Sequence, residues 1–132
     1  MRVAVLVVRV LLGAMLLVFG LNGFLHFLPP PPAPPAGDAF LGALAAGGVM
    51  TVVKAFEAIV GVLLLAGRFV PLALVMLVPI AVNIVLYHAT FDPAGVVPGV
   101  VVAAMLTFLL WAYRAHLMPL LRPTAAPLVA VT

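Results

Sequence analysis

The sequence predicts an all-α integral membrane protein, a bundle of four membrane-spanning helices with a short interfacial helix after the first. Three observations predict this fold class. Hydrophobic residues make up 67% of the 132 residues and charged residues only 7%, whereas soluble domains average about 45–50% apolar and about 25% charged residues. The mean hydropathy is +1.43. Four apolar stretches are long enough to cross a hydrocarbon core of about 30 Å, and the length allows a single domain.

The first apolar stretch, residues 3–28, is predicted to be a spanning helix. Arg2 and Arg9 precede its most apolar part, an arrangement that signal peptides share. No small-residue cleavage site follows the apolar core, so we expect a retained helix. Gly13 and Gly20 lie on it at a helical spacing, which predicts close packing against a neighbouring helix.

A proline-rich stretch and a short helix are predicted to join the first two spans. The run at residues 29–35 breaks the helix and favours a stiff polyproline II loop. A docking site for a proline-binding partner is the alternative interpretation of this run. Asp38 is predicted to be the N-cap of a short interfacial helix over residues 39–46.

Three further spans are predicted at residues 49–66, 69–88 and 96–118. Pro79 lies inside the third span and should kink it, because a proline removes one backbone hydrogen bond. Residues 119–132 contain several prolines, so an irregular tail is expected there.

The charged residues divide between the two sides of the predicted bundle. Alternation of the spans places Asp38 and Asp92 on one side. The other side receives Arg2, Arg9, Arg68, Arg114 and Arg122. Because cytoplasmic loops are enriched in Lys and Arg, the sequence predicts that both termini are cytoplasmic and that the interfacial helix is extracytoplasmic.

The composition also excludes several classes of function. Basic residues are scattered singly rather than clustered, so we expect no nucleic-acid partner. The chain has no cysteine, which excludes disulfide and thiolate chemistry. The sequence has no nucleophile motif, metal-ligand set or phosphate-binding loop. We therefore expect no metal and no catalysis by this chain alone.

Lys54 and Glu57 are the most informative residues of the second span. They lie one helical turn apart in an apolar stretch, where each ionisable side chain costs about 2.5–3.5 kcal/mol on insertion scales. Three interpretations stay open. The pair neutralises itself while Lys54 reaches the outer headgroups, it handles a ligand or a proton, or it contacts a partner subunit.

Polar side chains near the outer ends of the first and third spans are expected to join this pair. Lipid cannot satisfy polar groups, so the simplest packing buries them together in an outward-facing pocket. The predicted ligand-binding residues are Lys54, Glu57, Asn22, His26, Asn83, Tyr87 and His88.

Two subsets of these residues have alternative interpretations. Asn22 and Asn83 are also typical of hydrogen bonds between membrane helices. His26 and His88 fall on the same side at similar depth, as axial ligands of a metal or haem would. Because both histidines end a span, we expect interfacial residues instead.

Several segments resemble the DoxX family of small bacterial membrane proteins. The similar segments are FGLNGFLHFLPPPP at residues 19–32, the stretch from KAFEAIVG to DPAG at residues 54–95, and WAYR at residues 111–114. The resemblance implies a four-helix bundle in the bacterial inner (plasma) membrane and an accessory role beside a quinone-linked oxidoreductase. Gly23 departs from the family, because similar sequences are expected to carry a basic residue there. Lys54 is then the only deep cation.

Together these observations predict a non-catalytic or accessory membrane subunit whose pocket binds a quinone, a lipid or a similar small molecule. The expected partners are the lipid bilayer and either a second copy of the chain or an oxidoreductase subunit. One alternative is a structural scaffold for a membrane oxidoreductase complex. The other is a small proton-coupled transporter, against which the apolar inner half argues.

Overall fold

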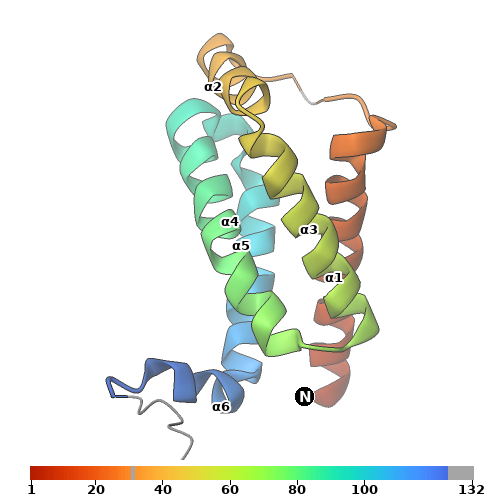
Figure 1. The fold of residues 1–132 in the computed structure, drawn as a ribbon, viewed down its shortest axis with the longest axis vertical. Coiled ribbons are helices and arrows are strands. Elements are labelled where there is room, and N and C mark those ends of the chain that lie inside the picture. The colour runs from red at the N-terminus through yellow and green to blue at the C-terminus, as the bar shows by residue number, and fades with distance from the viewer. Residues whose placement is uncertain (31, 125–132) are drawn as a thin grey trace, which may run out of the picture.

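The computed structural model describes residues 1–30 and 32–124, and within these residues the chain forms helices and connecting turns with no strand. Four long helices stand side by side as a bundle, and a shorter one crosses one end of it (Figure 1). Four helices are long and apolar enough to cross a membrane, as predicted. The helix bounds are α1 Arg2–Leu25, α2 Pro35–Ala46, α3 Val49–Ala66, α4 Val70–Phe91, η1 Pro93–Gly95, α5 Val96–Ala112, α6 Arg114–Leu117 and η2 Met118–Leu121.

The helix α3 has the predicted bounds, but α1 ends at Leu25 rather than at residue 28. His26 adopts a left-handed conformation with a φ of 51°, and its N–H donates to the carbonyl of Asn22. The Asn22 side chain accepts from the N–H of Leu28 at 2.6 Å. These bonds close the helix one turn early, before the prolines begin.

The short helix α2 begins at Pro35, four residues earlier than predicted. Pro34 occupies the N-cap position and Asp38 lies in the first turn, so the expected Asp38 cap is wrong. Proline suits the first helical position, because its fixed φ is already helical and its missing N–H has no partner there. Asp38 still complements the positive end of the helix dipole.

The helix α4 runs from Val70 to Phe91, so its C-terminal end extends beyond the predicted residue 88. The N–H of Asp92 donates to the carbonyl of His88, and Pro93 then stops the helix. The helix continues through Pro79, whose carbonyl accepts a 2.8 Å hydrogen bond from the side-chain amide of Asn83.

The helix α5 ends at Ala112, six residues before the predicted end of the fourth span. The Arg114 side chain donates to the carbonyl of Trp111 at 2.7 Å, the group that a continuing helix would use. The chain then turns away from the bundle as α6 and η2 (Figure 1). Residues up to Leu121 are therefore helical where an irregular tail was expected, and residues 125–132 of that tail lie outside the described residues.

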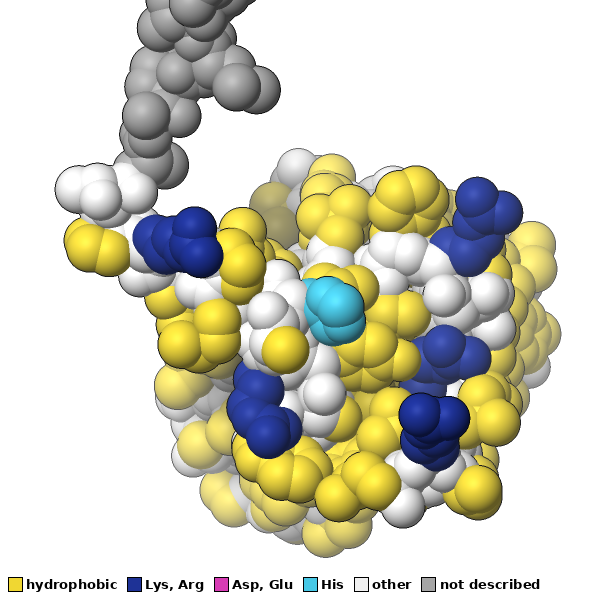
Figure 2. Space-filling model, turned by 90° about the horizontal axis from the view of Figure 1, so that it is seen from below, with side chains coloured by type: hydrophobic (Ala, Val, Ile, Leu, Met, Phe, Trp, Pro, Cys, Tyr) yellow, Lys and Arg dark blue, Asp and Glu magenta, His cyan; other side chains and the backbone are white. Residues whose placement is uncertain are grey.

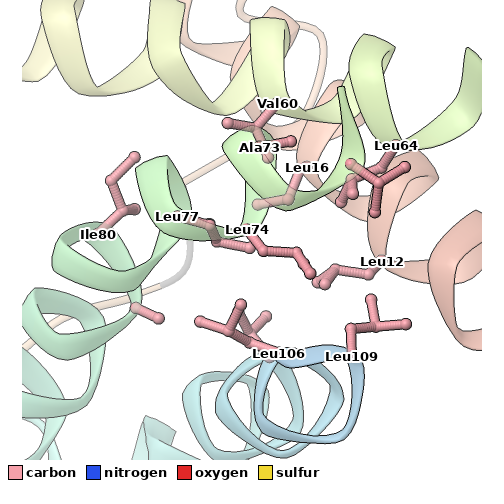
Figure 3. Packing of buried hydrophobic residues seen from close by; sticks show 13 residues of the cluster. Leu12, Leu16, Val60, Leu64, Ala73, Leu74, Leu77, Ile80, Leu106 and Leu109 are labelled. Atoms are coloured by element: carbon pink, nitrogen blue, oxygen red, sulfur yellow. The ribbon is translucent and has the colours of Figure 1, made fainter. Parts of the chain in front are cut away.

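Leucines from the four long helices form the core, as the close view in Figure 3 shows. The same helices expose many large apolar side chains on their outer faces. This arrangement suits a bundle surrounded by lipid rather than by water. The largest fully buried side chains are Leu12, Leu64, Leu74, Leu77, Leu109 and Val60.

The closest packing in the bundle joins α1 to α3 through glycines. A Cβ placed on Gly20 would lie 2.5 Å from the backbone nitrogen of Ala58, and one on Gly61 would lie 2.6 Å from that of Leu17. A Cβ on Gly13 would lie 3.1 Å from the Cβ of Leu64. The predicted close packing at Gly13 and Gly20 is confirmed.

Among the described residues, the charged side chains at one end of the bundle are all basic. Figure 2 views the molecule from the end at which α1 begins and α5 finishes; this face carries scattered Lys or Arg side chains, one histidine and no described acidic side chain. Asp38 and Asp92 lie at the opposite end, in α2 and in the turn after α4. The charge separation predicted from the sequence is therefore present in the folded bundle.

Candidate functional site

Lys54 and Glu57 form a closed ion pair within α3. The Lys54 Nζ lies 2.7 Å from Glu57 Oε2, one turn further along the helix. Glu57 is 4% exposed and is the only charged residue among residues 1–30 and 32–124 that is buried. The Lys54 side chain is 25% exposed. A buried carboxylate requires such a partner, because an unpaired charge inside a protein is strongly destabilising.

Gly23 of α1 makes room for the Lys54 side chain. A Cβ on Gly23 would lie 2.7 Å from the Lys54 Cβ and 2.8 Å from its Cδ. The lysine stem therefore lies flat against the α1 backbone while its ammonium group turns toward Glu57. Glycine at this position therefore lets α1 and α3 pack closely on either side of the lysine stem.

A cavity of about 530 Å³ lies beside the pair, between α2, α3 and α4. Most of its wall is apolar. Lys54 and Glu57 contribute the charges, and α4 adds amide, hydroxyl and imidazole groups. The lining residues are Phe40, Leu41, Leu44, Val49, Met50, Val53, Lys54, Glu57, Pro79, Ile80, Asn83, Ile84, Leu86, Tyr87, His88, Thr90 and Phe91.

The structure brings together five of the seven residues predicted to form the pocket. Those five are Lys54, Glu57, Asn83, Tyr87 and His88. The other two, Asn22 and His26, do not line this cavity. Asn22 closes the end of α1 through Leu28, and His26 is exposed at the same helix end.

The contribution of α2 to the cavity was not predicted from the sequence. Phe40, Leu41 and Leu44 face the cavity from this helix. Leu44 follows Leu41 by three residues and Phe40 by four, which places it on one helical face with each of them. This spacing was the available signal. The helix α2 occupies the place next to α4 that we expected the end of α1 to take.

An aromatic cluster holds α2 over the C-terminal end of α4. The ring of Phe40 lies 5.1 Å from that of Phe91 and 6.2 Å from that of Tyr87, both roughly parallel to it. A Cβ on Gly37 would lie 2.7 Å from the Tyr87 hydroxyl oxygen. Glycine at this position therefore lets the tyrosine reach beneath α2.

His88 is held at the rim of the cavity by Asp92. The His88 Nδ1 lies 3.2 Å from Asp92 Oδ2, and Asp92 Oδ1 accepts from the N–H of Gly95 at 3.1 Å. His26, at the end of α1, takes no part in this arrangement. Within residues 1–30 and 32–124, no group of three or more potential metal-ligating side chains is found.

The site therefore combines a largely apolar chamber with one buried ion pair and a few polar groups on a single wall. Such a chamber suits a molecule with an apolar body and a polar head. Comparisons of the chain with protein-family models, with curated proteins and with solved structures find no match.

Proposed function

We propose that this chain is a non-catalytic membrane protein that binds a small amphipathic molecule, a quinone or a lipid, in the cavity between α2, α3 and α4. The observation that carries the proposal is the cavity itself, about 530 Å³ in volume and adjacent to the buried Lys54–Glu57 pair. Small-molecule sites typically have volumes of about 300–1,000 Å³, apolar walls and a few placed polar groups.

The residues present fit a quinone head. An ammonium group has three N–H donors, and Lys54 directs one of them to Glu57. Its other donors and the Tyr87 hydroxyl are suited to quinone carbonyls, while Ile80 and Leu44 would pack against the ring and tail. A bound quinone would supply the capacity to accept electrons, which agrees with an accessory role in a DoxX-like oxidoreductase complex.

Binding explains the structure better than transport does. Below the cavity, the buried leucines Leu12, Leu64 and Leu109 fill the bundle toward its basic end. A carrier needs access from both sides, and this packed region would have to open for it. Co-purification from native membranes tests the accessory role, which predicts either a stoichiometric oxidoreductase subunit or a second copy of the chain.

A cavity-filling variant tests the binding proposal. Leu44→Trp places an indole in the cavity wall, whereas Leu72→Trp adds the same group on the outer face of α4, where Leu72 is 54% exposed. Native mass spectrometry with ubiquinone-1 as the probe should show retention by the wild type and by Leu72→Trp, and loss in Leu44→Trp. Equal retention by both variants would refute the proposed site.

We place the chain in the bacterial inner membrane with both termini in the cytoplasm and α2 at the outer interface. The basic end supports this orientation, because positive residues favour the cytoplasmic side. The chain has no cysteine, so single cysteines at Ala36 and Ala115 can report the topology. An impermeant maleimide applied to spheroplasts should label Ala36→Cys and leave Ala115→Cys unmodified; the reverse pattern would invert the orientation.

A further inference from the structure

A second cavity, of about 540 Å³, lies at the basic end of the bundle, between the start of α1 and the end of α5. The function proposed above makes no use of it. Arg2 and Arg9 line it from α1, and Arg114 lines it from the other side beside Trp111 and Tyr113. Three arginines therefore converge on one cavity in a chain that contains six basic residues.

The positive charge in this cavity has no acidic counterpart. No Asp or Glu lines the cavity, and the three acidic residues of the chain are Asp38, Glu57 and Asp92, none of which lies at this end. Figure 2 shows the same imbalance on the surface of this end. Like charges gathered without partners favour an anion between them.

Arg9 lies deeper than the other two arginines. It follows Arg2 by seven residues, which corresponds to about 10 Å along the helix. Its Nε is buried and has no hydrogen-bond partner among the described residues. Its terminal nitrogens pack against Gly67, where a Cβ would lie 2.7 Å from one of them. A buried N–H donor of this kind favours an acceptor beside it.

Arg114 is held in place before any ligand arrives. Its Nη1 donates to the carbonyl of Trp111 at 2.7 Å, and its guanidinium carbon lies 4.7 Å from the centre of the Trp111 ring. Trp and Tyr side chains commonly lie at the headgroup level of a membrane. The cavity therefore presents cations beside an aromatic wall at the depth at which lipid phosphates lie.

We propose that this cavity binds the phosphate of an anionic phospholipid, with Arg2, Arg9 and Arg114 around the phosphate oxygens. Arginine matches phosphate geometry with paired N–H donors, and basic pockets between spanning helices are typical sites for anionic headgroups. The exposed apolar residues Leu6, which lines the cavity, and Val10, one helical turn further along α1, continue from the cavity toward the middle of the span. They would contact the acyl chains, which favours a lipid over a soluble phosphate.

The single tryptophan of the chain makes the site directly measurable, because Trp111 lines the cavity. Bromine on acyl chains quenches nearby indole fluorescence. In detergent, brominated phosphatidylglycerol should quench Trp111 at a mole fraction about fivefold or more below that of brominated phosphatidylcholine, given the expected gain for each basic residue near an anionic lipid. Equal quenching by the two lipids would overturn the proposal.

Matched arginine variants locate the effect. Arg9→Gln should remove most of the preference for phosphatidylglycerol, and Arg2→Gln provides an independent variant at an exposed position. Arg68→Gln removes the same charge from the same end but outside the cavity, so it should keep the preference. If Arg68→Gln loses as much as the other two, general surface charge explains the binding and the site is wrong.

A competition arm distinguishes the two sources of phosphate. Unbrominated phosphatidylglycerol should restore the fluorescence, whereas millimolar glycerol 3-phosphate should leave it quenched. Recovery with glycerol 3-phosphate alone would assign the cavity to a soluble phosphate instead. These measurements do not involve the cavity beside Glu57, so their outcome is independent of the quinone proposal.

Discussion

Removing Lys54 should destabilise the protein more than removing both charges of the ion pair. In Lys54→Met, the Glu57 carboxylate keeps its 4% exposure and loses the ammonium group that lies 2.7 Å away. The buried carboxylate is then left without a partner for its charge, and an unpaired charge inside a protein is strongly destabilising.

We therefore expect Lys54→Met to lower the free energy of unfolding by about 3–4 kcal/mol at pH 7, which is within the range of about 3–5 kcal/mol for broken buried pairs. Lys54→Met combined with Glu57→Gln removes both charges and should recover most of the stability at pH 7.

Reversible unfolding in mixed micelles at pH 7, followed by circular dichroism, measures these differences. The two single variants and the double variant complete a double-mutant cycle. Additive losses within about 0.5 kcal/mol would show that the two side chains do not interact energetically. If Lys54→Met is as stable as the variant that lacks both charges, the reasoning about the unpaired buried charge is refuted.

Three further predictions concern packing. Gly20→Ala should cost about 1–3 kcal/mol by overpacking, since its Cβ would meet the backbone of α3. The control Gly42→Ala has nothing within 4 Å of its Cβ and should stabilise α2. Thermal melts compare the two variants, and equal melting temperatures would contradict the close approach of α1 and α3. Phe40→Ala removes two aromatic contacts, each worth about 0.5–1.5 kcal/mol, so hydrogen exchange in α2 should accelerate while exchange in α1 does not. Leu12→Ala should cost about 2–5 kcal/mol, because Leu12 is completely buried, whereas Leu72→Ala on the outer face should cost far less in the same unfolding assay.

The positions of the spans were predictable because hydrophobicity and length determine them. The ends of α1 and α5 were not predictable in this way. The end of α1 depends on the side chain of Asn22 reaching Leu28, and the end of α5 depends on Arg114 reaching Trp111. In both cases a side chain takes the hydrogen bond of a backbone group near the helix end. Average hydropathy carries no information about such bonds. The bounds of α3 were predicted correctly because glycines flank it, at Gly48 and Gly67.

The candidate site was partly predictable for a similar reason. Depth along a span follows from residue number, so the shared level of Glu57 and Asn83 could be inferred. Which helix packs beside each span could not be inferred, because it depends on packing among all the helices. Asn22 was placed at the right level in α1, but α2 fills the space next to α4. That Gly23 makes room for the Lys54 side chain likewise could not be inferred without knowing that α1 packs against α3.

That contact also bears on how the chain is made. During synthesis α1 enters the membrane before α3, which brings the ionisable pair into an environment that disfavours it. When α3 enters, Gly13 and Gly20 let it pack closely against α1, and α1 at Gly23 covers the aliphatic part of the Lys54 side chain. The helix α1 thus covers part of the ionisable pair as α3 inserts, and we expect α3 to pack against α1 as soon as it enters the bilayer.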